Sequence, residues 1–442
     1  MAARLEGACR NTRYRFFQVE PGTPDVSVTL LLLQLSVILL SAWAFGAVLR
    51  VLGQPAVIGE IAAGVALGPM LFGKLAPDQQ RMLFDAGHLV AIDGIGQIGL
   101  VLFMFSTGVE LREVLSNKKQ LMASGSIAAT SFVIPFVVGL LLAGYLYKTA
   151  AQPGVSPWLF AFFMGCALST TALPIMARIL EELRMTRSEP GALALSAAAI
   201  ADIPSWFLLL AVTTVMRGGD NTSLAVRATL LVVLTAAMLL LLLPSPRRIM
   251  GAYLAKPRVH AVWQGLLLPG VVLCAASTEV LGAQAAFGAL LFGVCAPRPA
   301  TAASGEPDPF GAVVRTLLLP VFFASTGLHA VIAVQSWENV AMFALILIGA
   351  VGGKLLGAAI GTLAFSHPWR IALSVGALMN SRGLMELVVI NIGLQAGIIQ
   401  PSLFTMLLLM AVLTTLMTAP TVRLLNRVKW TPLSARIISP RP

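Results

Sequence analysis

Hydrophobic residues are grouped in thirteen long runs separated by short polar segments. Each run is close to the roughly 20 apolar residues that a helix needs to cross a bilayer. The runs cover residues 27–49, 55–73, 94–111, 120–146, 157–182, 191–216, 223–244, 261–280, 284–297, 313–333, 339–365, 370–396 and 402–424. Glycine and proline close many of them, as in Gly53-Gln-Pro55 and Pro244-Ser-Pro246. The pattern predicts an all-α polytopic membrane protein with about 13 transmembrane helices.

The composition agrees with a membrane protein and argues against a soluble enzyme. The chain is 57% hydrophobic and only 11% charged, whereas soluble domains carry about 25% charged residues. A net charge of +11 would suggest a nucleic-acid partner in a soluble protein. Here the basic residues lie between the hydrophobic runs, so topology in the lipid bilayer explains them and no nucleic acid is expected. The four cysteines are scattered and imply no disulfide framework.

Lysine and arginine are distributed unequally between alternate loops. With thirteen spans the two tails lie on opposite sides, and the loops on the side of the N-terminus hold few basic residues. The other side holds Arg50; Arg112, Lys118 and Lys119; Arg178, Arg184 and Arg187; Arg247, Arg248, Lys256 and Arg258; Arg298; and Arg370. Basic loops favour the cytoplasmic side, which predicts a multi-pass plasma-membrane protein with its N-terminus outside and its C-terminus in the cytoplasm. The four arginines of the N-terminal tail oppose this assignment.

Two short motifs recur seven spans apart. Phe103-Met-Phe-Ser-Thr-Gly108 in the third run matches Phe322-Phe-Ala-Ser-Thr-Gly327 in the tenth, and Gly64-Val-Ala-Leu-Gly-Pro69 in the second faintly echoes Gly293-Val-Cys-Ala-Pro297 in the ninth. An odd offset reverses the direction of a helix across the membrane, which is typical of inverted-topology repeats in transporters. Chance similarity between membrane helices is the alternative.

The repeat predicts the domain organisation. The N-terminal tail covers residues 1–26, the membrane domain 27–424 and a short basic cytoplasmic tail 425–442. Within the membrane domain, one six-helix repeat covers about 27–216, a linker helix about 223–244 and the second repeat about 261–424.

The fifth and twelfth runs correspond in the repeat, and both contain helix-breaking sequences. The fifth holds Ser169, Thr170 and Thr171 close to Pro174, whose ring nitrogen cannot donate to the carbonyl of Thr170. The twelfth reads Met379-Asn380-Ser381-Arg382-Gly383-Leu-Met-Glu386 and is polar in mid-membrane. Two crossed broken helices are therefore expected, with the half-helix ends presenting unpaired backbone groups to one point.

Asp202 lies in the middle of an apolar run in the sixth span. A charged aspartate at such a depth costs roughly 2.5–3.5 kcal/mol on insertion scales. It is either a structural hydrogen-bonding residue or an ion and proton site. Pro204 cannot donate to the carbonyl of Ile200, and this oxygen, one turn from the carboxylate, is a candidate cation ligand.

Three further ionisable residues within predicted spans are candidates for the same site. Lys354 sits beside a ridge of glycines and needs an anion, for which Asp202 is the obvious candidate. Arg382 and Glu386 are spaced i, i+4 and can pair. Their pairing serves either gating or charge compensation at the helix break, and we favour compensation. The sequence contains no metal-binding motif, so neither a metal nor a cofactor is expected.

These motifs together resemble the monovalent cation/proton antiporters of the second superfamily branch, especially the Kef-type and plant CHX-type sodium or potassium/proton exchangers. The matching segments lie between about residues 50 and 420: Pro55–Pro69, Leu168-Ser-Thr-Thr-Ala172, Asp202, Leu319-Pro-Val-Phe-Phe323, Lys354 and Met379–Leu387. The resemblance implies a sodium/proton antiporter-like fold, with a dimerisation domain and a mobile core domain, and hence a homodimer.

The resemblance also implies roles for individual residues. Asp202 falls on the essential ion-binding aspartate, and Thr170 and Thr171 fall on the unwound stretch of the first crossing helix. Lys354 falls on the basic residue that pairs with the acidic site. Arg382 falls in the second crossing helix, together with Glu386.

One position departs from the family pattern. Members usually carry Asp, Asn or Gln immediately before the essential aspartate, but this chain has Ala201. The site therefore lacks one ligand, which leaves the preferred ion and the stoichiometry open and favours electroneutral one-for-one exchange. The expected function is secondary active exchange of K⁺ or Na⁺ for protons by alternating access at one buried carboxylate.

Two other functions are alternatives to exchange. A transport-inactive or altered-substrate relative, such as a sensor or an organic-ion carrier, is the main alternative on the same fold. An intramembrane protease is disfavoured, because an aspartyl protease needs two deep aspartates and no His-Glu-x-x-His motif is present.

Overall fold

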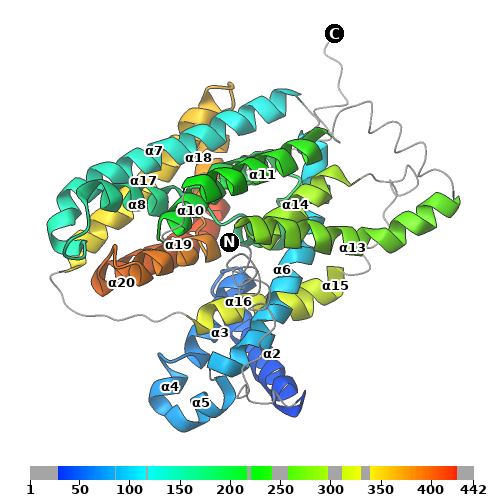
Figure 1. Cartoon of the computed structure of the whole chain (residues 1–442), viewed down its shortest axis with the longest axis horizontal. Coiled ribbons are helices and arrows are strands. Elements are labelled where there is room, and N and C mark those ends of the chain that lie inside the picture. Colours follow the sequence, from blue (N-terminus) through cyan, green and yellow to red (C-terminus); the bar gives the residue numbers. More distant parts are fainter. Residues whose placement is uncertain are drawn as a thin grey trace, which may run out of the picture.

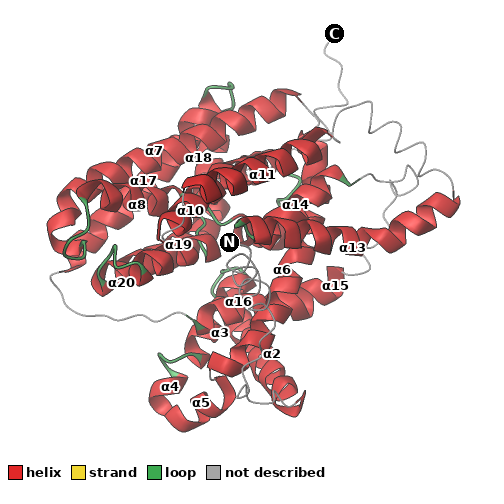
Figure 2. Cartoon of the chain, in the orientation of Figure 1, coloured by secondary structure: helices red, strands yellow, loops and turns green. Residues whose placement is uncertain are grey.

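The computed structural model describes residues 28–84, 86–115, 118–216, 221–240, 257–296, 311–329 and 339–425. The predicted N-terminal tail and, beyond Leu425, the predicted basic tail lie outside these residues. Within them, the structure is helical and contains no strand (Figure 2).

Within the described residues, each of the thirteen hydrophobic runs falls on one helix or on consecutive helical segments (Figure 1). In chain order the elements are α2 (Val28–Val51), α3 (Ala56–Leu67), α4 (Phe72–Leu75), α5 (Pro77–Phe84), α6 (Ala86–Leu115), α7 (Lys118–Ala150), α8 (Pro157–Ser169), α9 (Leu173–Glu182), α10 (Glu189–Met216), α11 (Asn221–Leu240), α13 (Pro257–Leu281), α14 (Ala285–Cys295), α15 (Gly311–Val313), the π-helix η2 (Val314–Leu318), α16 (Leu319–Leu328), α17 (Asn339–Leu363), α18 (Trp369–Met379), α19 (Leu384–Gln395) and α20 (Pro401–Leu425). Eight stretches of the described residues are long and apolar enough to cross a membrane.

The helices form two groups (Figure 1). The first group contains α2 to α6 and α13 to α16, and the second contains α7 to α10 and α17 to α20, while α11 touches both. Glycines define these groups, because a glycine without a Cβ lets two backbones approach closely. Each helical glycine of the described residues whose added Cβ would come within 3 Å of another helix faces a helix of its own group.

Mirrored glycine contacts support the inverted repeat. Gly64 of α3 lies against Gly327 of α16, and Gly108 of α6 lies against Gly293 of α14. The sequence motifs equate Gly64 with Gly293 and Gly108 with Gly327. Exchanging the two repeats therefore maps one contact onto the other, as a pseudo-two-fold axis requires.

The glycine contact between α6 and α14 makes a testable prediction. A Cβ at Gly108 would collide with the carbonyl oxygen of Leu290, whereas Gly94 on the same helix has no atom within 4 Å of an added Cβ. We expect Gly108→Ala to destabilise the protein by about 1–3 kcal/mol through overpacking. Gly94→Ala should be neutral or stabilising by up to about 1 kcal/mol, because alanine is the better helix former. Thermal unfolding in detergent compares the two, and equal stability would contradict the close contact.

Candidate functional site

The fifth span is broken at its predicted point. Helix α8 ends at Ser169, residues 170–172 are non-helical, and α9 begins at Leu173 with Pro174 in its first turn. Thr170 has extended dihedral angles, and its hydroxyl donates to the carbonyl of Ala167 at 3.1 Å. The hydroxyl of Ser169 likewise donates to Cys166 at 3.0 Å. Both side chains therefore satisfy carbonyls of the last turn of α8, which has lost its following helical amides.

The twelfth span is broken in the same way, between α18 and α19. The two breaks touch, because the amide of Ala172 donates to the carbonyl of Ser381 at 3.0 Å. Gly383 permits this approach, since an added Cβ would collide with the side chain of Ile175. Asn380 is buried at the end of α18. The two predicted crossing helices are therefore present.

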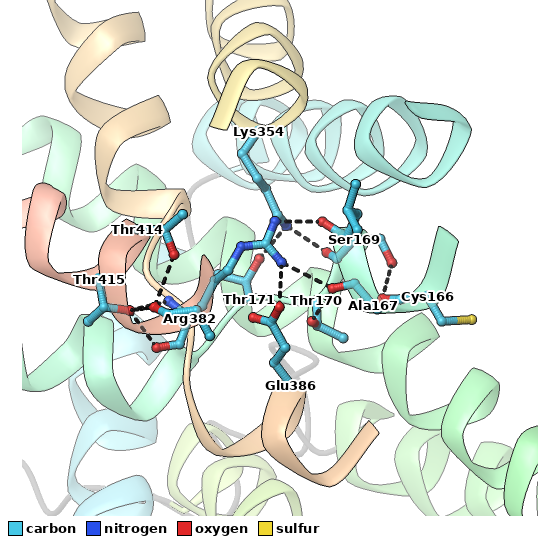
Figure 3. Close-up of polar contacts among 12 residues, drawn as sticks. Cys166, Ala167, Ser169, Thr170, Thr171, Lys354, Arg382, Glu386, Thr414 and Thr415 are labelled. Carbon is cyan, nitrogen blue, oxygen red and sulfur yellow. Dashed lines mark hydrogen bonds and ion pairs between the residues drawn. The ribbon is translucent and has the colours of Figure 1, made fainter. Parts of the chain in front are cut away.

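Two buried cations cover the carboxyl end of α8 (Figure 3). The Arg382 guanidinium donates to the carbonyls of Ala167 at 3.0 Å and Leu168 at 2.8 Å. The Lys354 ammonium donates to the Ser169 carbonyl and to the Thr171 hydroxyl, both at 2.6 Å. Lys354 is 0% exposed and Arg382 1%. Positive charge is favourable here because a helix carries partial negative charge at its carboxyl end.

The position of Lys354 differs from the direct ion pair expected with Asp202. Both residues are described, and no hydrogen bond or ion pair joins them. The physical reason lies at the end of α8, where the Ser169 carbonyl needs a donor within the membrane and takes the ammonium.

Asp202 lies inside the continuous helix α10 and is only 6% exposed. Among the described residues its carboxyl has no hydrogen-bond or ion-pair partner, so the structural hydrogen-bonding interpretation finds no support there. Ala201 is buried and offers no polar side chain. Pro204 is within the same helix and, lacking an amide proton, leaves the Ile200 carbonyl without its usual donor.

Arg382 and Glu386 form an ion pair of 3.2 Å in which both side chains are buried. The guanidinium nitrogen that pairs with Glu386 also donates a hydrogen bond to the Ala167 carbonyl. Glu386 thus balances one of the two cations at the end of α8, which favours the charge-compensation interpretation over gating. One oxygen of Glu386 has no partner in the described part of the chain.

A second charged cluster connects the two helix groups. Arg178 of α9 lies 3.7 Å from Glu60 of α3 and 3.4 Å from both Glu181 and Glu182 on its own helix. Glu182 also accepts from the amide of Ala56 at 2.6 Å, which caps the start of α3. The contacts of Arg178 with Glu60 and of Glu182 with Ala56 could not be predicted from the sequence, because each joins segments more than 100 residues apart.

A cavity of about 440 Å³ lies between α9 and α10 on one side and α6, α13 and the start of the tenth span on the other. Its walls are mainly apolar, and its polar residues are Ser106, Thr107, Glu110, Glu181, Thr186 and Arg315. Asp202 is not part of the wall, whereas Leu195, two turns earlier in α10, is. Among the described residues no group of three His, Cys, Asp or Glu side chains could hold a metal ion.

Thr415 of α20 makes a contact with the second break that the sequence did not predict. Its hydroxyl accepts from the amide of Arg382 at 3.0 Å and lies 2.7 Å from the carbonyl oxygen of the same residue. The only sequence signal is a group of threonines in the thirteenth run, Thr414, Thr415 and Thr418. In an apolar helix such residues normally bond to their own helix, so this signal does not identify the partner.

Comparison with known proteins places this architecture in a family. Residues 35–425 match the family model described as "Sodium/hydrogen exchanger, transmembrane". The chain is 34% identical to the Na⁺/H⁺ antiporter NhaS4 of Synechocystis, over 89% of this chain and 97% of that protein. It is 33% identical to Cation/H⁺ antiporter 17 of Arabidopsis thaliana, over 90% of this chain and 48% of the relative, and so spans about half the length of such plant proteins.

The fold agrees with solved structures. The sodium proton antiporter MjNhaP1 of Methanocaldococcus jannaschii superimposes with a TM-score of 0.61 at 15% identity, covering 91% of this chain and 99% of that one. At this identity the likeness concerns the fold alone. Together with the match over residues 35–425, it leads to one conclusion: this chain belongs to the sodium/hydrogen exchanger family.

Proposed function

We propose that the protein is a secondary active antiporter that exchanges a monovalent cation, K⁺ or Na⁺, for protons at Asp202. The observation that carries this proposal is a buried carboxylate, 6% exposed, without an internal partner among the described residues. A group so costly to bury is free to accept either a proton or a cation. The names of the relatives, which include Na⁺/H⁺, K⁺/H⁺ and cation/H⁺ antiporters, support the same reaction.

Exchange follows from competition at this carboxyl group. A proton or a dehydrated cation neutralises it, but not both at once. Hydroxyl and carbonyl oxygens are suitable ligands for a hard cation, and the candidates are Thr170, Thr171 and the Ile200 carbonyl. Movement of the second helix group against the first would expose the site to each side in turn.

The proposed stoichiometry is one cation for one proton. Ala201 supplies no second acidic group beside Asp202. Lys354 donates to the Ser169 carbonyl and the Thr171 hydroxyl, and neither of these contacts involves Asp202. A single titrating acid then carries the whole exchange, and no net charge crosses the membrane.

The cavity beside α9 and α10 is the proposed access route from the cytoplasm. Its polar residues include Thr186 and Arg315, and the loop at Thr186 belongs to the basic, predicted cytoplasmic side. A plasma-membrane location, a cytoplasmic C-terminus and a homodimer complete the proposal, and their support is the loop charges and the family resemblance.

Purified protein in liposomes tests this function. With a trapped pH dye, we expect external Na⁺ or K⁺ to drive protons out of acid-loaded vesicles, with Li⁺ as a third cation. Clamping the membrane potential should leave the initial rate unchanged if exchange is one-for-one. Protein-free vesicles are the control. The absence of cation-dependent flux with all three ions would contradict exchange, and a rate that depends on the clamp would contradict the stoichiometry.

A further inference from the structure

One side chain satisfies both backbone groups of a single residue in the second break (Figure 3). The Thr415 hydroxyl accepts from the Arg382 amide at 3.0 Å and donates to the Arg382 carbonyl at 2.7 Å. The break deprives both groups of helical partners, and a buried peptide group without a partner is destabilising. Both residues are buried, which excludes bulk water as a substitute.

The neighbouring threonines of α20 do not do this. The hydroxyls of Thr405, Thr414 and Thr418 bond only to carbonyls of α20 itself, at 3.1, 3.1 and 3.0 Å. Thr418 lies one turn beyond Thr415 and is also buried, at 1% exposure against 5% for Thr415. The cross-helix bonds are therefore a property of position 415 and not of threonine in this helix.

The contacts continue from Thr415 to the candidate ion ligands. Thr415 fixes the backbone of Arg382, whose guanidinium holds the carbonyls of Ala167 and Leu168. Ser169, the last residue of α8, follows Leu168, and the unwound stretch from Thr170 to Ala172 comes directly after it. Thr415 thus reaches the proposed cation-binding surface through one intermediate side chain.

We propose that Thr415 is a positioning residue for exchange, which holds the second break in the arrangement that lets Thr170 and Thr171 bind the cation. The hydroxyl has one proton and two acceptors within reach, the Arg382 carbonyl at 2.7 Å and the Ala411 carbonyl at 2.8 Å. Donation can therefore pass to Ala411, so the Arg382 carbonyl is released while the hydroxyl stays paired. The pair of hydrogen bonds between the Thr415 hydroxyl and the Arg382 backbone, here called the Thr415 clamp, can therefore break and re-form as the two helix breaks shift during transport. The proposal rests on the exchange function proposed above.

The test compares Thr415→Val, which keeps the shape but removes the hydroxyl, with Thr415→Ser, which keeps the hydroxyl. In liposomes, we expect Thr415→Val to raise the KM for the driving cation by about five- to tenfold, the effect of losing about one buried hydrogen bond. Thr415→Ser should remain within about twofold of wild type on the same reasoning. Thr418→Val is the matched control and should leave the KM unchanged, because it removes only a bond within α20.

A purely structural role would lower the amount of folded protein, and with it the maximal rate, without moving the KM. A wild-type KM in Thr415→Val, an equal change in Thr418→Val, or a failure of Thr415→Ser to preserve the wild-type KM would each overturn the proposal. If the valine variant does not fold, Thr415→Ala, which cannot overfill the site, takes its place. Hydrogen exchange of the Arg382 amide should accelerate in the valine or alanine variant. Unchanged protection of this amide would also contradict the proposal that Thr415 holds the Arg382 backbone.

The two proposals fail in different ways. Lack of cation-driven proton flux in the wild-type protein contradicts the proposed antiport. The amide hydrogen-exchange comparison then still tests whether Thr415 holds the Arg382 backbone. Normal wild-type flux combined with an unchanged KM in Thr415→Val contradicts only the role of Thr415.

Discussion

Replacement of Asp202 by asparagine is expected to abolish cation-driven proton flux while the protein still folds. The amide has nearly the same shape as the carboxyl group but can neither release a proton nor bear the charge that attracts a cation. The carboxyl makes no hydrogen bond among the described residues, so the substitution breaks no described contact. Flux in proteoliposomes with a pH dye measures the loss, and size-exclusion chromatography in detergent measures folding.

Asp93→Asn is a control for this experiment. Asp93 of α6 accepts a hydrogen bond from Ser325 and lies 3.6 Å from His329, within the first helix group and away from the crossed breaks. Its replacement should leave cation-driven flux close to wild type. Undiminished flux in Asp202→Asn would refute the proposed site, even if every other part of the fold were correct.

Replacement of Arg382 by methionine is expected to cause the largest loss of stability. The substitution leaves Glu386, 1% exposed, without its ion-pair partner, and removal of one member of a buried pair typically costs about 3–5 kcal/mol. The Leu168 carbonyl loses its guanidinium donor as well, and the Ala167 carbonyl keeps only the Thr170 hydroxyl. Thermal unfolding in detergent, with the yield of monodisperse protein as a second measure, should show the loss.

The paired variant Arg382→Met with Glu386→Leu separates the contributions. Removing both charges removes the unpaired carboxylate, so the double variant should be more stable than Arg382→Met alone. It should not reach the wild type, because the buried Leu168 carbonyl still lacks its guanidinium donor, at about 1–3 kcal/mol. A double variant no more stable than the single one would contradict charge compensation. A double variant with wild-type stability but no cation-driven proton flux would favour the gating interpretation instead.

The spans and the breaks could be predicted from the sequence because both depend on local chemistry. A run of apolar residues identifies the part of a helix that crosses the bilayer, and polar residues next to Pro174 or Gly383 identify the point where the helix stops. Helix ends were less predictable. The run 94–111 lies within the longer α6, since a helix can continue through polar residues, while the run 55–73 is interrupted after Leu67, where Gly68 and Pro69 follow.

The i, i+4 spacing predicted the pair of Arg382 with Glu386, but partners on other helices could not be predicted, because they depend on distances between helices. Lys354 and Asp202 have opposite charges and each follows a segment of small residues that permits close helix approach, which made a direct pair the natural expectation. The competing acceptor was a backbone carbonyl, exposed only because α8 ends at Ser169, beside α17. The two bonds from Thr415 to Arg382 depend equally on the approach of α20 to the second break.

The distribution of glycine contacts has a mechanical consequence. Glycine contacts bring the backbones of helices within each group into direct contact. Displacing these helices relative to one another meets steep repulsion, so each group is expected to move as a rigid body. Between the two groups, the Arg178 guanidinium lies 3.4–3.7 Å from carboxylates that belong to two helices, α3 and α9. A guanidinium with several acceptors can exchange them one at a time. Shear is therefore easiest along the boundary that carries α9, and sliding there displaces the half-helix that starts beside the candidate ion ligands.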